Sequence, residues 1–208
     1  MPNSKTNISL SEQATSFTKD FLDLWVFDKE GTKIGRVADL AITMGEEFPN
    51  VSSLVVAVKL RISLFGSAKF EAIIPWRQVK SLDEDGIALG IAFSEVKTGK
   101  LNQRELLLKK NVMDQQIVDN EGRKILRVND VKLKAFNEHL RLVGVETGIK
   151  GLLYRLGAGR RLVRVANLLN VKIMENIIMW DLVEQFDNEM KRIKLSISQE
   201  MLKDLINL

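Results

Sequence analysis

Short apolar stretches separated by turn-forming residues run through most of the chain. Apolar pairs at 26–27 and 117–118 are each followed by an Asp-x-Glu-Gly turn and then by another apolar stretch. Aspartate opens such turns by bonding its own backbone, and glycine adopts the positive φ that closes a hairpin. We therefore predict a β-hairpin at both places, with a bulge interrupting the second strand of each.

Three further stretches are typical of β-strands. Residues 53–62 are rich in Val and Leu, residues 70–74 are apolar, and residues 87–93 follow a turn at 83–86. So many short strands in so short a length of chain indicate a small closed β-barrel, because closure leaves no sheet edge open.

The chain contains an internal repeat. Residues 28–39 (DKEGTKIGRVAD) match residues 119–130 (DNEGRKILRVND) at eight of twelve positions, and 73–79 (IIPWRQV) resemble 177–183 (IIMWDLV). The blocks recur at separations of 91 and 104 residues, so the second copy holds 13 extra residues. We therefore predict a mainly β protein made of two tandem barrels related by duplication and packed with approximate twofold symmetry. The repeated positions with a predicted structural role are Asp28, Gly31, Arg36, Asp39, Trp76, Asp119, Gly122, Arg127, Asp130 and Trp180.

The repeat divides the chain into five segments. We expect a flexible segment over 1–20, a first barrel over 21–93, a linker over 94–111, a second barrel over 112–187 and the start of a helical region over 188–208. Residues 196–199 have the spacing of a capping box, and apolar residues follow at helical spacing. Because this apolar stripe still runs at Leu208, we expect the helical domain to continue beyond it.

These motifs resemble the PRC-barrel family. In each copy the Asp-x-x-Gly turn leads into K-I-x-R-V-x-D, and an apolar pair later precedes x-Trp-x-x-Val. The resemblance covers residues 21–93 and 112–187. The family includes a cytoplasmic part of the photosynthetic reaction centre H subunit and the carboxy-terminal domain of a ribosome maturation factor. It implies a role in assembly or regulation and supplies no catalytic residues.

A narrower resemblance lies in the second copy and after it. Residues 143–162 and 177–186 are similar to bacterial proteins in which PRC barrels precede an MgtE-type amino-terminal domain and CBS domains. Residues 195–208 resemble the start of the MgtE-type domain. This implies a link to magnesium transport through domain company only, with magnesium as a ligand of the full-length protein and no cofactor in the part at hand.

Composition excludes several kinds of chemistry. The chain has 208 residues and no cysteine, which excludes disulfides, thiolate nucleophiles and cysteine-based metal sites. A single histidine leaves little for serine-hydrolase or multi-histidine metal chemistry. The acidic turns offer too few ligands for a calcium loop, so we predict no metal site. No apolar stretch reaches the length of a membrane span, and the polar amino terminus lacks a signal peptide's apolar core. We expect a cytoplasmic protein that is not an enzyme.

The charge is unevenly distributed. The net charge is +4, but residues 121–172 carry +8 and residues 173–208 carry −3. Within 151–172, leucines and valines can line one helix face. This segment could cover its own or the sister barrel, or dock on another protein or on the chain's own missing carboxy-terminal domain. A membrane surface or nucleic acid is disfavoured, since Tyr154 is its only aromatic residue. The partner-binding candidates are Arg155, Arg160, Arg161 and Arg164.

We therefore expect a regulatory or scaffolding module of a magnesium-transporter-related protein, acting through protein or domain contacts. The alternative is an adaptor that binds a protein or an RNA–protein assembly, as the ribosome maturation relative does. A homodimer is compatible with both.

Overall fold

A computed structural model describes residues 7–8, 14–61, 67–83, 85–96, 100–118, 125–136, 139–148, 176–180, 183–187 and 192–195. Within them the protein is mainly β, as predicted, with a few one-turn helices. The helical turns are α1 (Phe17–Asp20), η1 (Trp76–Gln78), η2 (Phe93–Glu95) and the π-helical η3 (Leu108–Val112). The strands are β1 (Asn7–Ile8), β2 (Thr15–Ser16), β3 (Trp25–Phe27), β4 (Lys33–Thr43), β5 (Asn50–Arg61), β6 (Ser67–Pro75), β7 (Val79–Leu82), β8 (Ile87–Leu89), β9 (Glu105–Leu107), β10 (Gln116–Val118), β11 (Ile125–Arg127), β12 (Asp130–Phe136), β13 (His139–Glu146), β14 (Ile177–Met179), β15 (Val183–Asp187) and β16 (Arg192–Leu195).

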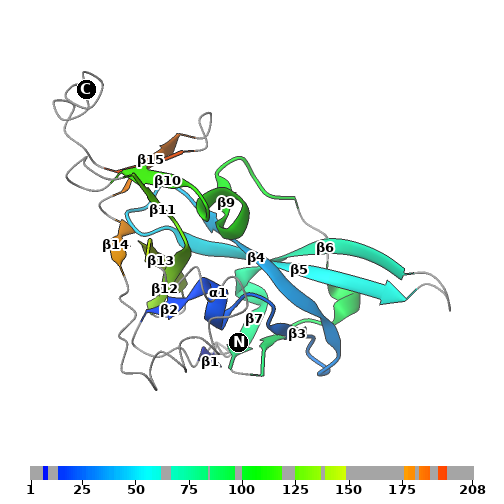
Figure 1. The fold of residues 1–208 in the computed structure, drawn as a ribbon. Helices are drawn as coiled ribbons and strands as arrows, with labels where there is room; N and C mark the ends of the chain where they lie inside the picture. Colours follow the sequence, from blue (N-terminus) through cyan, green and yellow to red (C-terminus); the bar gives the residue numbers. More distant parts are fainter. Residues whose placement is uncertain are drawn as a thin grey trace, which may run out of the picture.

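Most strands belong to one curled, twelve-stranded sheet (Figure 1). Its main path runs β1-β7-β8-β3-β4-β5-β13-β12-β2, while β6 pairs with β5, β9 with β4 and β14 with β13. The pairs β10–β11 and β15–β16 form two small separate sheets. The strands of the two predicted barrels are therefore joined into one sheet, because β5 and β13 pair where Asn50 lies opposite Arg141.

The first half of the chain is built around the long strands β4, β5 and β6. Valines and isoleucines in these strands favour extended structure, and apolar side chains such as Val37, Val56 and Ile74 are buried in the core. The β4–β5 register shifts between Val37 and Asp39 and again between Ala41 and Ile42. These shifts bend β4 around the core. The three-residue spacing between Ile34 and Val37 predicted a bulge just ahead of the first of these two shifts.

The core is continuous across both halves. Buried side chains of β4 and β5, such as Leu40 and Leu54, belong to the same cluster as Leu133 and Leu142 of β12 and β13. The fold therefore rests on one shared apolar interior.

In the part of the chain that the structure describes, no helix is both long enough and apolar enough to cross a membrane.

Two turns have the chemistry that the sequence indicated. Asp28 Oδ1 accepts the backbone N–H groups of Glu30 and Thr32, and Gly31 has φ +81°. Burial acts to raise the pKa of Asp28, but the N–H donors of Thr32, Glu30 and Phe93 hold this pKa below its usual value. Asp28 therefore stabilises the β3–β4 turn as a carboxylate. The turn before β8 is built in the same way around Asp83 and Gly86.

Three segments differ from their expected roles where the structure describes them. The expected flexible segment 1–20 includes β2 and α1, and Phe17 is fully buried. The expected linker 94–111 includes β9 and most of η3, with Leu108 fully buried. The described part of the expected helical region 188–208 is a strand, β16, paired with β15. Strands β2 and β9 pair with strands far away in the sequence, which local sequence does not reveal, whereas β16 pairs with the nearby β15.

Candidate functional site

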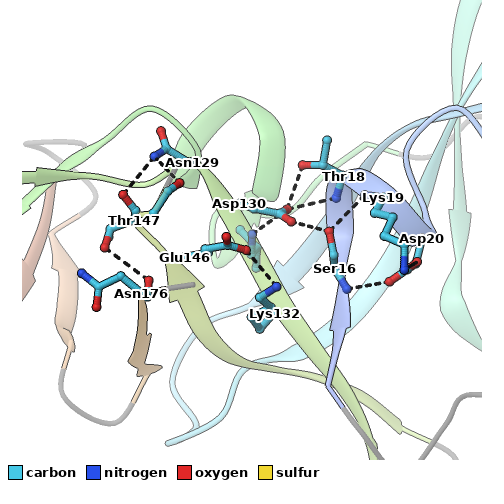
Figure 2. Close-up of polar contacts among 12 residues, drawn as sticks. Ser16, Thr18, Lys19, Asp20, Asn129, Asp130, Lys132, Glu146, Thr147 and Asn176 are labelled. Carbon is cyan, nitrogen blue, oxygen red and sulfur yellow. Dashed lines mark hydrogen bonds and ion pairs between the residues drawn. The ribbon is translucent and has the colours of Figure 1, made fainter. Parts of the chain in front are cut away.

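A deeply buried polar cluster surrounds Asp130, the first residue of β12 (Figure 2). Asp130 is 1% exposed and faces the segment Thr15–Asp20, formed by β2 and α1, which we call the first strap. Its carboxylate accepts hydrogen bonds from the Ser16 hydroxyl, the Thr18 hydroxyl (2.8 Å) and the Thr18 backbone N–H (3.0 Å). The Val131 N–H also donates to it, at 2.8 Å. Asp130 thus caps α1 from another strand and fixes the first strap on β12.

Asp39 of β4 makes the corresponding contact in the first half of the chain. It faces Glu105–Val112, formed by β9 and η3, which we call the second strap. Its carboxylate accepts the backbone N–H groups of Lys109 (2.8 Å), Lys110 (3.2 Å) and Leu40 (2.8 Å). Burial raises the pKa of Asp39 to about 6, although these N–H donors act to lower it. Asp39 therefore caps η3 as Asp130 caps α1.

The strands of the two straps are also added to the sheet at corresponding places. Ser16 of the first strap lies opposite Lys132 of β12, and Leu107 of the second strap lies opposite Ala41 of β4. Ser16 and Leu107 are 91 residues apart, and so are Ala41 and Lys132. This is also the separation of the first sequence repeat. In β4 and in β12 the register with the following long strand shifts directly after this position. The first strap, which precedes β3 in the sequence, therefore lies on β12, and the second strap, which precedes β10, lies on β4.

The backbone that follows each strap is equivalent as well. Asp23 and Asp114 have left-handed φ values of 64° and 65°. Their N–H groups donate to the carbonyls of Val37 and Val128, at 3.0 and 2.8 Å. These two residues turn the chain from each strap into the next strand of its own half. Aspartate tolerates this conformation better than most residues do.

A buried ion pair lies next to Asp130, and among the described residues it has no counterpart next to Asp39. Lys132 Nζ is 2.8 Å from Glu146 Oε2, and the two residues are 8% and 1% exposed (Figure 2). The residues 91 positions earlier are Ala41 and Val55, which are apolar. An ion pair with so little exposure is costly to break, since either charge alone would be left without its partner in the interior.

A second set of hydrogen bonds in Figure 2 ties β12 to the end of β13. The Asn129 amide donates to the carbonyls of Thr147 and Gly148, at 3.1 and 3.0 Å. Thr147 in turn donates its N–H to the Asn176 carbonyl at 2.8 Å. The residues that follow β13 and the residue that precedes β14 therefore lie together.

Within the described residues, the repeated arginines do not pair with the repeated aspartates. Arg36 donates to the Asp23 carbonyl at 2.6 Å, and its Cζ lies 3.9 Å from the centre of the Trp25 ring. Arg127 Nε lies 2.9 Å from Asp114 Oδ1. The aspartates bind strap N–H groups instead, and both arginines fasten the turn that follows a strap.

The repeated tryptophans occupy similar places. Trp76 directly follows β6 and Trp180 directly follows β14, and each of these strands pairs with a single neighbour in the sheet. The two tryptophans are 6% and 4% exposed and belong to the buried apolar cluster. The remaining predicted residues lie outside the described residues; they are Asp119, Gly122, Arg155, Arg160, Arg161 and Arg164.

The described surface also contains a groove of about 680 Å³ beside β7 and β8. Its charged residues are Asp28, Lys29, Arg77 and Lys80. Asp28 is already bonded to backbone N–H groups, and Lys29 lies 3.4 Å from Glu95. In the described part of the chain no three His, Asp or Glu side chains lie together in a way that could hold a metal ion.

Comparison with known proteins gives no relative from which a function could be transferred. No family model matches the chain, and no curated protein matches it.

Sequence reasoning singled out Asp39 and Asp130 but not their partners. Ser16 and Thr18 lie in a segment that was expected to be flexible, so nothing marked them as ligands of a carboxylate. The sequence does contain a signal for Lys132 and Glu146. Each is a charged residue that directly follows a valine in an apolar strand. Charged residues at such positions are rarely buried unless they are paired.

Proposed function

We propose that this chain is a non-enzymatic regulatory or scaffolding module, built from two related PRC-like units and acting through protein or domain contacts. The observation that carries the proposal is the use of the deepest polar groups. Asp39 and Asp130 are bonded to backbone N–H groups of the straps, and Lys132 and Glu146 are bonded to each other. Groups held in this way support a rigid scaffold and are not presented to a substrate.

The duplication is supported by the repeated geometry. The strap registers, the left-handed aspartates and the register shifts recur at the separation of the sequence repeat. A scaffold with two similar halves can present two similar surfaces or hold one inserted segment in a fixed place.

The segment 149–175 is the best candidate for partner contact. The described residues that flank it are joined by the hydrogen bond between Thr147 and Asn176. Its arginines are Arg155, Arg160, Arg161 and Arg164. We propose that these bind another protein or a domain that follows in the same polypeptide.

A pulldown of the full chain tests this proposal. The four arginines are changed together to alanine, and the control changes four exposed cations, Lys69, Arg77, Lys80 and Arg104, to alanine. We expect protein partners to be lost with the first variant and kept with the second. Equal recovery with both variants and the wild type would refute the proposal. Recovery of RNA that falls steeply with salt and with the arginine change would favour the adaptor alternative.

The link to magnesium is a separate proposal that rests on the resemblance alone. Full-length protein is titrated with magnesium, with calcium as the control, and followed by calorimetry and protease protection. We expect magnesium to alter the protection pattern. An unchanged pattern and no heat of binding would remove the magnesium link without affecting the scaffold proposal.

A further inference from the structure

The two straps are exchanged between the halves, and this exchange has the geometry of a twofold contact. The first strap precedes β3 in sequence but lies on β12, whereas the second strap precedes β10 but lies on β4. Contacts that come in such reciprocal pairs are characteristic of an isologous interface, in which residue i meets j and the equivalent of j meets the equivalent of i.

The direct pairing of the two halves fits the same symmetry. Asn50 of β5 lies opposite Arg141 of β13 in an antiparallel pair, and the two positions are 91 residues apart. Each residue therefore pairs with its own counterpart. In an antiparallel pair, self-pairing of this kind occurs where a twofold axis passes through the sheet.

The straps supply the apolar part of this interface. Phe17 of the first strap and Leu108 of the second are the first residues of their helical turns, and both are fully buried. Each turn is capped by a carboxylate of the other half, and each strand adds to an edge of the other half. The edge of β4 or β12 therefore binds a segment with three features. These are a short strand that pairs with the edge, an apolar anchor residue and a helical turn that the aspartate caps.

We propose that the contact between the halves is a strap-exchanged homodimer interface carried within one chain, and that the partner it fits is a sister unit of the same sequence pattern. This rests on the duplication proposed above but not on any external partner. It follows that the two halves hold each other through the straps and the β5–β13 pair, and that the covalent link near residues 97–99 is not needed for their association.

The absence of cysteine from the chain makes a crosslinking test clean. A protease site is inserted between residues 98 and 99 of the full chain, and two cysteine pairs are introduced separately. Glu105→Cys with Thr43→Cys tests the exchanged register, since these residues are direct cross-strand neighbours and neither belongs to an aspartate cap or to the buried ion pair. Glu105→Cys with Lys134→Cys is the matched control, because Lys134 is the position that Glu105 would face if the second strap lay on its own half.

After cleavage, we expect the two fragments to co-elute as one 1:1 complex with an unchanged far-UV circular dichroism spectrum. On a non-reducing gel, the Glu105/Thr43 pair should hold the fragments together, while the Glu105/Lys134 pair should leave them separate. The proposal is overturned if the cleaved fragments separate or lose their structure. It is equally overturned if the Glu105/Lys134 pair forms the disulfide within the second fragment. Neither result depends on the arginine pulldown, so failure of one proposal is distinguishable from failure of the other.

Discussion

Two aspartates at repeated positions do the same work in this protein. Asp39 and Asp130 each accept the N–H of the following residue and N–H groups of a distant helical turn. A helical turn leaves its first N–H groups without partners inside the helix, so a carboxylate placed there is stabilising. Both aspartates therefore join a long strand to a segment far away in sequence.

Asp39 should give the protein a distinctive pH dependence. Because burial raises its pKa to about 6, the folded state binds a proton there more readily than the unfolded state does. Its contribution to the free energy of unfolding should fall by about 3 kcal/mol as the pH rises from about 4 to about 6. Asp39→Asn cannot ionise and should lack this fall. Urea unfolding of both proteins between pH 4 and 7 measures it, and a constant difference between them would contradict the expectation.

The buried ion pair offers a matched set of substitutions from the chain itself. Lys132→Ala should lower the free energy of unfolding by about 3 kcal/mol, because it removes the ammonium group that lies against the buried Glu146 carboxylate. Adding Glu146→Val gives the residues found 91 positions earlier, Ala41 and Val55. The double variant should therefore be more stable than Lys132→Ala alone. Urea denaturation measures all of these proteins, and simple addition of two losses would show that the pair does not act as a unit.

At this scale the sequence identified residues better than it identified partners. The Asp-to-Gly turn at 28–31 and the core position of Trp76 follow from local rules of turn geometry and apolar burial. The partners of Asp39 and Asp130 could not be derived, since they are backbone N–H groups about 70 residues from Asp39, and N–H and hydroxyl groups 112 to 114 residues from Asp130. A carboxylate that binds uncharged groups leaves no complementary charge for the sequence to display.

Among the elements, the long strands were predictable and the straps were not. Strands β4, β5 and β6 are long runs with repeated β-branched residues, so their existence follows from the pattern. The straps consist of strands of two or three residues and single helical turns. Elements this short carry no measurable periodicity and are stable only through the packing of their anchors.

The anchors of the two straps should therefore matter equally. Phe17→Ala should cost about 3–5 kcal/mol and Leu108→Ala about 2–5 kcal/mol, because both side chains are fully buried and a cavity would remain. Lys19→Ala, an exposed position in the same strap as Phe17, should change stability by less than about 0.5 kcal/mol. Thermal and urea unfolding provide the values. A mild effect at either anchor would mean that its strap is dispensable.

The β4–β5 contact contains a position that requires glycine. A Cβ at Gly35 would lie 2.2 Å from the Ala57 carbonyl oxygen, so an alanine there would force the two strands apart. Gly35→Ala should destabilise by about 1–3 kcal/mol. At Gly90 the nearest atom would be 3.8 Å away, and Gly90→Ala should be tolerated. Denaturant midpoints of the two variants decide the matter, and equal tolerance would show that the strands can separate freely.

For the whole molecule, the sequence predicted two separate units whereas the structure joins their strands into one sheet. The repeat was visible because its turns and tryptophans are local features. The joining was not, because it depends on one pairing between β5 and β13 and on the reciprocal placement of two short straps. A sequence repeat predicts that two halves share a fold, but it does not predict how much of each half is supplied by the other.

Exchange of the straps predicts that the halves unfold together. If one half unfolds, its strap leaves the other half, which then loses a fully buried anchor and the pairing of a strand edge. Neither half can therefore retain its full stability alone, and a single cooperative transition is expected. The variant Trp25→Phe/Trp76→Phe leaves Trp180 as a fluorescent probe of the second half, and Trp25→Phe/Trp180→Phe leaves Trp76 in the first. Within each variant, the fluorescence midpoint in urea should coincide with the far-UV circular dichroism midpoint, which reports on the whole sheet. Midpoints that differ reproducibly in either variant would mean that the halves are independent, since a shared sheet with exchanged straps gives the two probes the same equilibrium to report.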